Sequence, residues 1–214
     1  MKSKIQSLKN GNKKTVIKKL FLTAAVAVSS LTFAQQFGAK AGMNVSTISD
    51  EGFDDTKSKV GYYAGVFMNV PVSESFSIQP EVLYNNLGSK VSYTVSGTTY
   101  SSTLNLDYVA VPVMFQYKAT PQFYLEAGPE FGFLVNAKQK FDNGSSSIVT
   151  ELDKEDFNSF NMGVGLGLGF DISKNVGLNA RYVAGFSDIT KESGPAADAK
   201  NKNNAFQVGL NIKF

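Results

Sequence analysis

Apolar and polar residues alternate along most of this chain, and the alternation predicts β-strands. The segment 203–214 reads N-N-A-F-Q-V-G-L-N-I-K-F, with apolar residues at the even positions from Phe206 to Phe214. A period of two places those side chains on one face of a strand. The same pattern predicts seven further strands, at 37–46, 59–70, from 76 onward, 104–117, 123 to about 138, 160–171 and 176–187.

The connections between these segments are alternately long and short. Short turns are expected at 71–75, 118–122 and 173–175, and long polar loops at 47–58, 140–157 and 188–202. Residues 88–103 are rich in Ser, Thr, Tyr and Gly, and they predict two strand extensions around a turn near Ser96 and Gly97. Pro80 cannot donate to a ladder, so it should mark a bulge or an unpaired position.

Eight strands connected in this way predict an all-β fold, an eight-stranded antiparallel up-and-down β-barrel. In such a barrel the last strand pairs with the first. We therefore expect 203–214 to lie beside 37–46, with Phe206 and Phe214 near the two ends of the barrel wall.

The first 34 residues have a different composition. Seven lysines and no acid precede the apolar run 20–33, and a small residue, Ala34, follows it. This order is typical of a secretory signal peptide, and we predict cleavage after Ala34. The alternative is a short membrane anchor, but the run is shorter than the ~20 residues that a spanning helix needs. Residues 35–214 then form the barrel domain.

Removing the leader reverses the sign of the net charge. The full chain carries 21 basic and 18 acidic residues, a net charge of +3, and the leader holds seven of the bases and none of the acids. The remaining chain would therefore carry −4. The basic character belongs to the leader, so nucleic acid is not expected as a partner.

Two kinds of barrel fit eight amphipathic strands. A soluble lipocalin-like barrel places its apolar residues inside, whereas an outer-membrane barrel places them outside against lipid. Four glycines lie on the polar face of 160–171, where a crowded interior would favour them. Phe160 and Phe170 lie ten residues apart on one face, as do Phe123 and Phe133, and such a spacing rises about 25 Å in a tilted strand. These observations favour a transmembrane barrel.

The chain contains no Cys and no His. Disulfides, tetrahedral zinc sites and catalysis by histidine are therefore excluded. The acidic stretches 50–55 and 151–156 do not have the spacing of an EF-hand loop, and the glycines of 163–169 do not form a nucleotide-binding motif. We expect no cofactor, no metal and no catalytic residue.

Five charged residues fall on the polar faces of the strands, at comparable distances from their starts: Lys40, Glu81, Glu126, Glu130 and Arg181. In a narrow interior these charges should pair, because an unpaired buried charge is costly. We interpret them as an ion-paired network that fills the barrel. The alternatives are a gated path for ions or small solutes, and a catalytic pair of carboxylates, which nearby Lys and Arg would disfavour.

Several segments of the chain resemble a known family. They include F-G-A-K-A-G-M-N at 37–44, S-F-S-I-Q-P-E-V-L-Y at 75–84, Y-V-A-V-P-V-M-F-Q-Y at 108–117 and F-Q-V-G-L-N-I-K-F at 206–214. These resemble the outer-membrane β-barrel proteins of Bacteroidetes-type bacteria, often called PorT-like, with an OmpA/OmpX-type architecture. The resemblance implies a place in the outer membrane, with loops outside the cell and both termini in the periplasm. It implies little about activity.

Three functions remain open from the sequence. The first is a structural or surface-interaction role through extracellular loops, the second a narrow channel for ions or small solutes, and the third a lipid-modifying enzyme, for which no catalytic cluster is found. The expected partners are outer-membrane lipid and the barrel-assembly machinery, for which Phe214 would serve as the recognition signal. We expect a monomer.

Overall fold

The computed structural model describes residues 35–49, 57–189 and 201–214. The predicted signal peptide, its cleavage after Ala34 and the acidic residues 50–55 lie outside these ranges. The chain divides into two units, residues 1–35 and residues 36–214, and the strands belong to the second.

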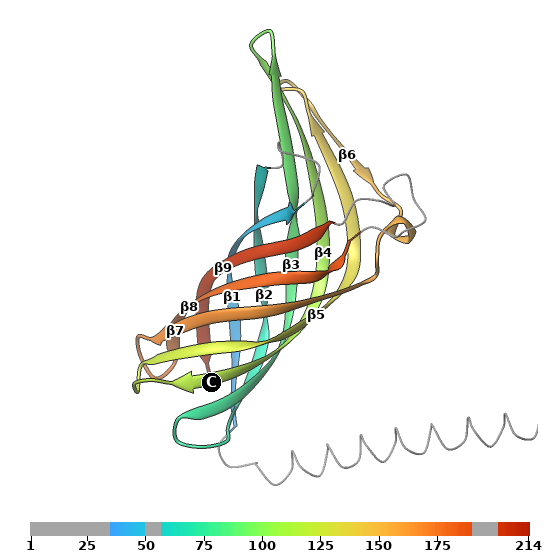
Figure 1. The fold of residues 1–214 in the computed structure, drawn as a ribbon. Helices are drawn as coiled ribbons and strands as arrows, with labels where there is room; N and C mark the ends of the chain where they lie inside the picture. Colours follow the sequence, from blue (N-terminus) through green and yellow to red (C-terminus); the bar gives the residue numbers. More distant parts are fainter. Residues whose placement is uncertain (1–34, 50–56, 190–200) are drawn as a thin grey trace, which may run out of the picture. The chain divides into compact units, whose positions relative to one another are not determined.

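Strands make up nearly all of this unit (Figure 1). They are β1 (Gln36–Ser49), β2 (Lys57–Pro71), β3 (Phe76–Val95), β4 (Thr98–Lys118), β5 (Phe123–Asp142), β6 (Ser147–Glu151), β7 (Phe160–Asp171), β8 (Val176–Asp188) and β9 (Lys202–Lys213), with a 3-10 helix, η1 (Lys154–Asp156), between β6 and β7. No helix in the described ranges is long and apolar enough to cross a membrane.

Eight of the strands form a closed antiparallel barrel. Each pairs with its neighbours in the order β4-β3-β2-β1-β9-β8-β7-β5, and pairing of β4 with β5 completes the ring. The closing seam joins β1 to β9 in continuous register, from Gly38 opposite Lys213 to Ser49 opposite Lys202. The predicted fold, and the predicted pairing of the last strand with the first, are therefore confirmed.

The prediction of a long loop at 140–157 is wrong for most of that segment. β5 continues to Asp142, and β6 folds back on it with Phe141 opposite Ile148. The turn between them is held by Asn143, whose Oδ1 accepts hydrogen bonds from the backbone N–H groups of Ser145 and Ser146. All five residues of β6 are exposed, yet their backbone groups pair with β5, so the polar composition of 140–157 alone did not indicate a loop.

The predicted extension around Ser96 and Gly97 is confirmed. β3 and β4 pair without a register shift out to Val95 opposite Thr98, and their hairpin projects beyond the other strands (Figure 1). Ser96 and Gly97 both have positive φ, 49° and 81°, as a two-residue hairpin turn requires.

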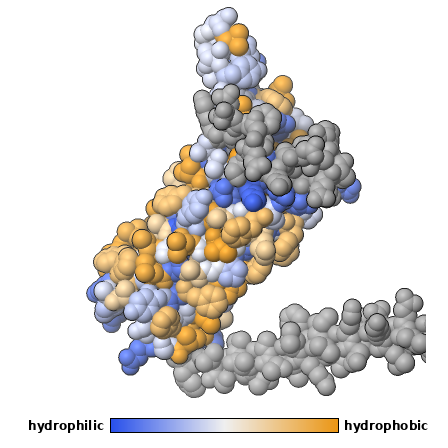
Figure 2. Space-filling model, in the orientation of Figure 1, coloured by the Kyte–Doolittle hydropathy of each residue, from blue (hydrophilic) through white to orange (hydrophobic). Residues whose placement is uncertain are grey.

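The apolar face of each strand points outward and the polar face inward. Arg181, Glu81, Glu126, Gln207 and Asn211 are among the buried side chains, whereas a set of large apolar residues on alternating positions is exposed. Figure 2 shows apolar residues over much of the barrel wall, with hydrophilic residues gathered toward the end where the hairpin projects. This arrangement suits a wall that faces lipid, as predicted.

Aromatic residues pair across strands toward both ends of the wall. Phe123 lies opposite Phe170, and ten residues further along both strands Phe133 lies opposite Phe160. The rings of Phe133 and Phe160 are 5.5 Å apart, and Tyr62 and Tyr84 form a second pair 6.1 Å apart. The spacing matches two aromatic girdles around an apolar band.

Beyond the barrel, the two faces of the sheet exchange their polarity. We call residues 89–95, 98–103, 138–142 and β6 together the outer sheet. Val91, Ser102, Phe141 and Ile148 lie opposite one another on its four strands. They share the face of the buried row Leu87, Leu106 and Ala137, because β3 and β4 keep their register. The face that is polar inside the barrel wall thus becomes the apolar face of the outer sheet.

Gly169 on β7 allows a close approach that a larger residue would prevent. A Cβ there would overlap the ring of Tyr124 on β5, whereas a Cβ at Gly132 would lie 3.4 Å from its nearest neighbour. We expect Gly169→Ala to lower the free energy of unfolding by about 1–3 kcal/mol, as overpacking does. Gly132→Ala, the control, should change it little. Urea unfolding of the barrel in detergent, read by heat-modifiable gel mobility, measures both, and equal losses would contradict this account.

Candidate functional site

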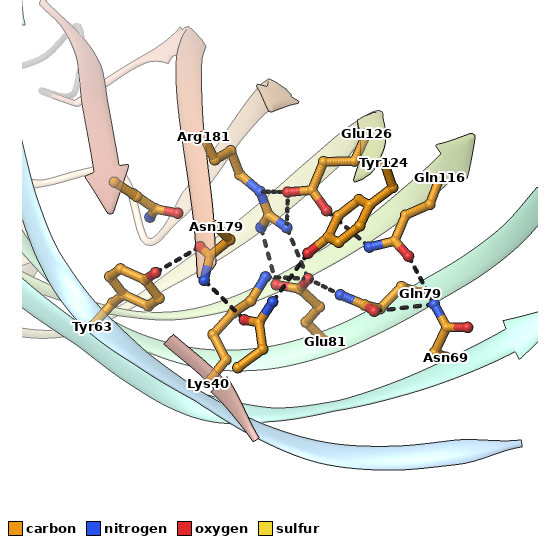
Figure 3. A network of polar contacts seen from close by, with 12 residues as sticks. Lys40, Tyr63, Asn69, Gln79, Glu81, Gln116, Tyr124, Glu126, Asn179 and Arg181 are labelled. Atoms are coloured by element: carbon orange, nitrogen blue, oxygen red, sulfur yellow. Dashed lines mark hydrogen bonds and ion pairs between the residues drawn. The ribbon is translucent and has the colours of Figure 1, made fainter. Parts of the chain in front are cut away.

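An ion-paired network occupies the interior of the barrel, and Arg181 on β8 is its centre (Figure 3). Its Nη1 and Nη2 donate to the two carboxylate oxygens of Glu81 on β3, at 2.9 and 2.8 Å. Its Nε donates to Oε1 of Glu126 on β5, at 2.8 Å. Lys40 on β1 pairs with Oε1 of Glu81, also at 2.8 Å. The inward alternation of four strands brings these side chains together.

The four groups form a neutral unit of two acids and two bases, which we call the charge quartet. Each of the four residues is at most 2% exposed. Burying a charge costs several kcal/mol unless it is paired and hydrogen-bonded. The planar guanidinium of Arg181 fits the carboxylate of Glu81 with two parallel bonds, and this bidentate form is among the strongest pairings available.

Amide side chains complete the bonding of the quartet's carboxylates. Gln79 donates to Oε1 of Glu81 at 2.8 Å, and Gln116 donates to Oε2 of Glu126 at 3.0 Å. Asn69 in turn donates to the side-chain oxygens of Gln79 and Gln116. Both carboxylates thus accept hydrogen bonds from cations and from amides inside the barrel.

A second chain of polar contacts crosses the same interior. Tyr63 donates to Asn179 at 2.8 Å, Asn179 donates to Asn211 at 2.8 Å, and Asn211 donates to the hydroxyl of Tyr124 at 3.0 Å. These residues were missing from the five predicted from charge alone. These residues alternate with the outward apolar residues of their strands, and this position was the signal that could have identified them.

Glu130 departs from the expected pairing. It is buried, at 8% exposure, but its Oε2 has no hydrogen-bond partner. Among the described residues, the ion pairs of the interior join only the other four predicted charges. Two bases are fully engaged by Glu81 and Glu126, so no cation is left in contact with the third acid. The expectation that all five charges pair is therefore wrong for Glu130.

An apolar cluster lies inside the barrel toward the outer sheet. Its buried members, which we call the apolar plug, are Ile48, Leu87, Leu106, Tyr108, Ala137, Ile189 and Ala205. Leu152 and Phe157, at either side of η1, pack against it. The backbone N–H of Leu152 donates to Ala137, and that of Asn158 donates to Ile189. The segment after β6 is thereby fixed over the inner apolar residues.

Sequence reasoning missed the apolar plug, although a signal was present. On β4 the outward apolar row has odd numbers, from Val109 to Tyr117, whereas Leu104, Leu106 and Tyr108 have even numbers. Ala110 and Met114, which also have even numbers, are buried as well, so this second apolar row marks the inward face of β4.

A polar cluster surrounds Asp107 on β4, toward the outer sheet. Asn86 donates to its Oδ1 at 2.5 Å and Asn136 to its Oδ2 at 2.9 Å. Lys59 donates to the side-chain oxygen of Asn86 and to the carbonyl of Leu87. No group of three or more potential metal ligands is found within the described ranges.

Phe214, the predicted assembly signal, is 76% exposed at the opposite end of the barrel from the outer sheet. Its backbone N–H donates to the carbonyl of Phe37 at 2.8 Å, which extends the seam between β9 and β1 by one bond. The side chain projects outward with the other exposed aromatic residues of that end.

Comparisons with known proteins agree with this architecture. A family model described as "Outer membrane protein beta-barrel domain" matches residues 33–191. Ail, the attachment invasion locus protein of Yersinia pestis, is 14% identical with a TM-score of 0.51, over 85% of this chain and 100% of that chain. Neisserial surface protein A is 12% identical with a TM-score of 0.48, over 85% and 99%. Such low identity shows the fold alone. Among curated proteins, none matches this chain.

The contrast between Glu81 and Glu130 gives a matched test of the charge quartet. Glu81→Gln should lower the free energy of unfolding by about 3 kcal/mol, because it leaves two buried cations with one carboxylate. Glu130→Gln should change it by less than about 1 kcal/mol, since that carboxylate has no ion-pair partner. Urea titration of both variants in detergent measures the difference. Equal destabilisation would show that the quartet is not the unit that holds the interior together.

Proposed function

Because the chain belongs to the outer membrane protein beta-barrel family, we propose that it is a closed barrel acting at the bacterial cell surface through its outer segments. In this role it neither conducts solutes nor catalyses a reaction. The observation that carries the proposal is the filling of the lumen at two levels, by the charge quartet and by the apolar plug.

The two levels oppose conduction for different physical reasons. Eight strands enclose an interior that side chains alone can fill. An ion that passed the charge quartet would have to displace paired groups that are bonded at 2.7–2.9 Å. It would then meet the apolar plug, whose hydrophobic side chains cannot replace its hydration shell.

The outer sheet supports a surface role. Four of its Ser and Thr residues, Ser92, Thr94, Thr99 and Ser101, share the face that continues the lipid-facing wall. A polar face at this level suits water and not lipid, so the sheet should stand clear of the membrane. β6 pairs with β5 alone among the described strands. The sheet thus presents hydroxyl groups on one face and Tyr93, Tyr100, Phe141 and Ile148 on the other.

The orientation follows from the same reasoning and belongs to the proposal. Residues 1–34 direct export, the outer sheet and long loops face outside, and both termini lie in the periplasm. The barrel-assembly machinery recognises the final strand with Phe214, and lipid surrounds a monomeric wall. The narrower kinship with PorT-like proteins of Bacteroidetes-type bacteria is part of this proposal, and it rests on the segments 37–44, 75–84, 108–117 and 206–214.

A narrow channel is the second candidate, and one observation favours it. Buried polar atoms inside the barrel lack hydrogen-bond partners, among them Oε2 of Glu130, Oδ1 of Asn44, Nδ2 of Asn85 and the hydroxyl of Tyr108. Buried polar groups of this kind usually bind water. A hydrated interior could carry small ions if the charge quartet or the apolar plug opened.

The absence of cysteine from the sequence allows a direct test of orientation. Thr98→Cys in the outer sheet should react with a membrane-impermeant maleimide on intact cells. Lys174→Cys, in the turn between β7 and β8, should react only after the outer membrane is permeabilised. Both positions are exposed, so accessibility on each side of the membrane decides the result. Labelling of Lys174→Cys alone on intact cells would overturn the proposed orientation.

Planar-bilayer recording separates the closed barrel from the channel. Wild-type protein that is folded by the criterion of heat-modifiable mobility should give no steady conductance, because both filled levels persist. Arg181→Ala should lose stability, by about 3–5 kcal/mol, since it leaves Glu81 and Glu126 with Lys40 as their only base. A stable conductance in the wild type would refute the proposal. Conductance in Arg181→Ala without a loss of stability would show that the quartet is a gate.

A further inference from the structure

A small pocket lies in the outer sheet, where four adjacent strands run beyond the barrel. It has a volume of about 170 Å³, and its lining includes Tyr93, Tyr100, Phe141 and Ile148, one residue from each of β3, β4, β5 and β6. The rings of Tyr93 and Tyr100 are stacked, with centroids 5.4 Å apart and planes inclined by 14°. The alternation of these strands thus gathers three rings and a branched aliphatic side chain around one hollow.

The exposure of these side chains is not explained by the fold. Tyr93 is 59% exposed, Phe141 48% and Ile148 67%, within the described part of the chain. Lipid accounts for equally exposed residues on the barrel wall, but the outer sheet meets water under the proposed surface role. Large apolar side chains that gather at a hollow in water mark a binding site.

Hydrogen-bonding groups accompany the apolar side chains of the pocket, since Ser102 and Asn143 also line it. Oγ of Ser102 accepts a hydrogen bond from Nε2 of Gln139 at 3.0 Å, so its own proton can be donated elsewhere. Nδ2 of Asn143 and the hydroxyls of Tyr93 and Tyr100 make no hydrogen bond within the described ranges. The pocket therefore combines apolar surface with polar groups that have capacity for a ligand.

The turn that borders the pocket is held by its own hydrogen bonds. Oδ1 of Asn143 accepts from the backbone N–H of Ser146 at 2.7 Å, and Oδ1 of Asp142 accepts from that of Gly144 at 2.9 Å. Gly144 has a φ of 84°, and a Cβ there would lie 3.5 Å from Cγ2 of Thr98, so the turn approaches β4. A site that is formed in advance loses less conformational entropy when a ligand binds.

We infer that this pocket binds one neutral hexose residue of a polysaccharide outside the cell. A hexose has a face of C–H groups that packs on an aromatic ring, and a rim of hydroxyls that donate and accept hydrogen bonds. Tyr, Ser and Asn side chains supply this combination of rigid apolar contact and adaptable hydrogen bonding. The pocket has the volume of about six water molecules at ~30 Å³ each, which is the space that one sugar ring displaces.

The charge of the lining selects a neutral ligand. Among the described residues that line the pocket none is basic, and Asp142 is the only acid. The backbone N–H of Gly144 occupies its Oδ1, and Nζ of Lys140 lies 4.0 Å from its Oδ2. An anionic sugar would find no cation in the lining to replace its hydration. The inference rests on the proposed surface role, because the pocket must face the medium outside the cell.

Surface plasmon resonance on immobilised dextran, mannan and galactan tests the inference. The barrel is kept in lauryldimethylamine oxide, because detergents with sugar head groups would compete for the pocket. Wild-type protein should bind at least one of the three polysaccharides, and the corresponding free hexose should displace it. Tyr100→Ala should weaken this binding about tenfold through the loss of a ring contact, and Ile148→Ala should weaken it severalfold.

Val149→Ala is the matched control. Val149 follows Ile148 on β6, is exposed, lies on the reverse face of the sheet and does not line the pocket. This variant should bind as the wild type does. Hydrogen exchange over 98–103 and β6 shows whether the outer sheet stays formed in each variant. Should Tyr100→Ala lose the sheet, Tyr100→Phe removes the hydroxyl alone and should still weaken binding.

Several outcomes would overturn the inference. Absence of binding by folded wild-type protein to all three polysaccharides would exclude a neutral hexose site. Equal binding by the wild type, Tyr100→Ala and Ile148→Ala would place the sugar elsewhere, and an equal loss in Val149→Ala would remove the specific role of the pocket. Binding to heparin or purified lipopolysaccharide in place of the neutral polymers would assign an anionic ligand. Cysteine labelling and bilayer recording test the surface role independently, so a closed, correctly oriented barrel that binds no hexose is distinguishable from a failure of the proposed function.

Discussion

An eight-stranded barrel has an interior that side chains must fill, and this limit explains most of what the chain contains. Every inward residue must find its partner inside, because neither lipid nor bulk water can reach it. The pairing of Arg181 with Glu81 and Glu126 meets this demand for the charges and joins strands that are far apart in the ring. Gly165, Gly167 and Gly169 satisfy the same limit sterically, because β7 carries no side chain at the positions where Arg181 and Tyr124 occupy the interior.

The fold could be predicted from the sequence because a period of two was sustained over every barrel strand. The charge quartet could also be located, since charged residues are rare on such faces and their positions along the strands coincide. The pairing of Glu130 could not be predicted. Strand parity shows that a side chain points inward, but it does not show which of three acids contacts two bases. That choice depends on the stagger of the strands, and it leaves Oε2 of Glu130 without a partner.

The errors at 140–157 and at the apolar plug have a common physical origin. A barrel wall in lipid needs an apolar outer face, whereas a sheet in water needs its apolar face turned inward. β3 and β4 keep their register along their length. Beyond Tyr84 and Val109 the outward face becomes polar, whereas apolar residues of the inward parity, among them Leu83, Leu87, Ala110 and Leu106, continue toward the outer sheet. A prediction that assigns all apolar residues of a strand to one face identifies the segment in the barrel wall. It misses the apolar plug and the outer sheet.

The filling of the barrel mouth and the polarity of the outer sheet therefore both follow from the same alternation of apolar and polar residues on β3 and β4. The inward turn of Leu87, Leu106 and Tyr108 places the apolar plug in the mouth of the barrel, and the same parity places Tyr93, Tyr100 and Phe141 on the continuing face of the outer sheet. A channel would require the inward row to remain polar up to the mouth, as the quartet and its amides are lower down. Instead the polar row moves to the outside of the projecting sheet, where it meets water. The strands whose side chains fill the lumen thus also form the sheet that projects beyond the barrel.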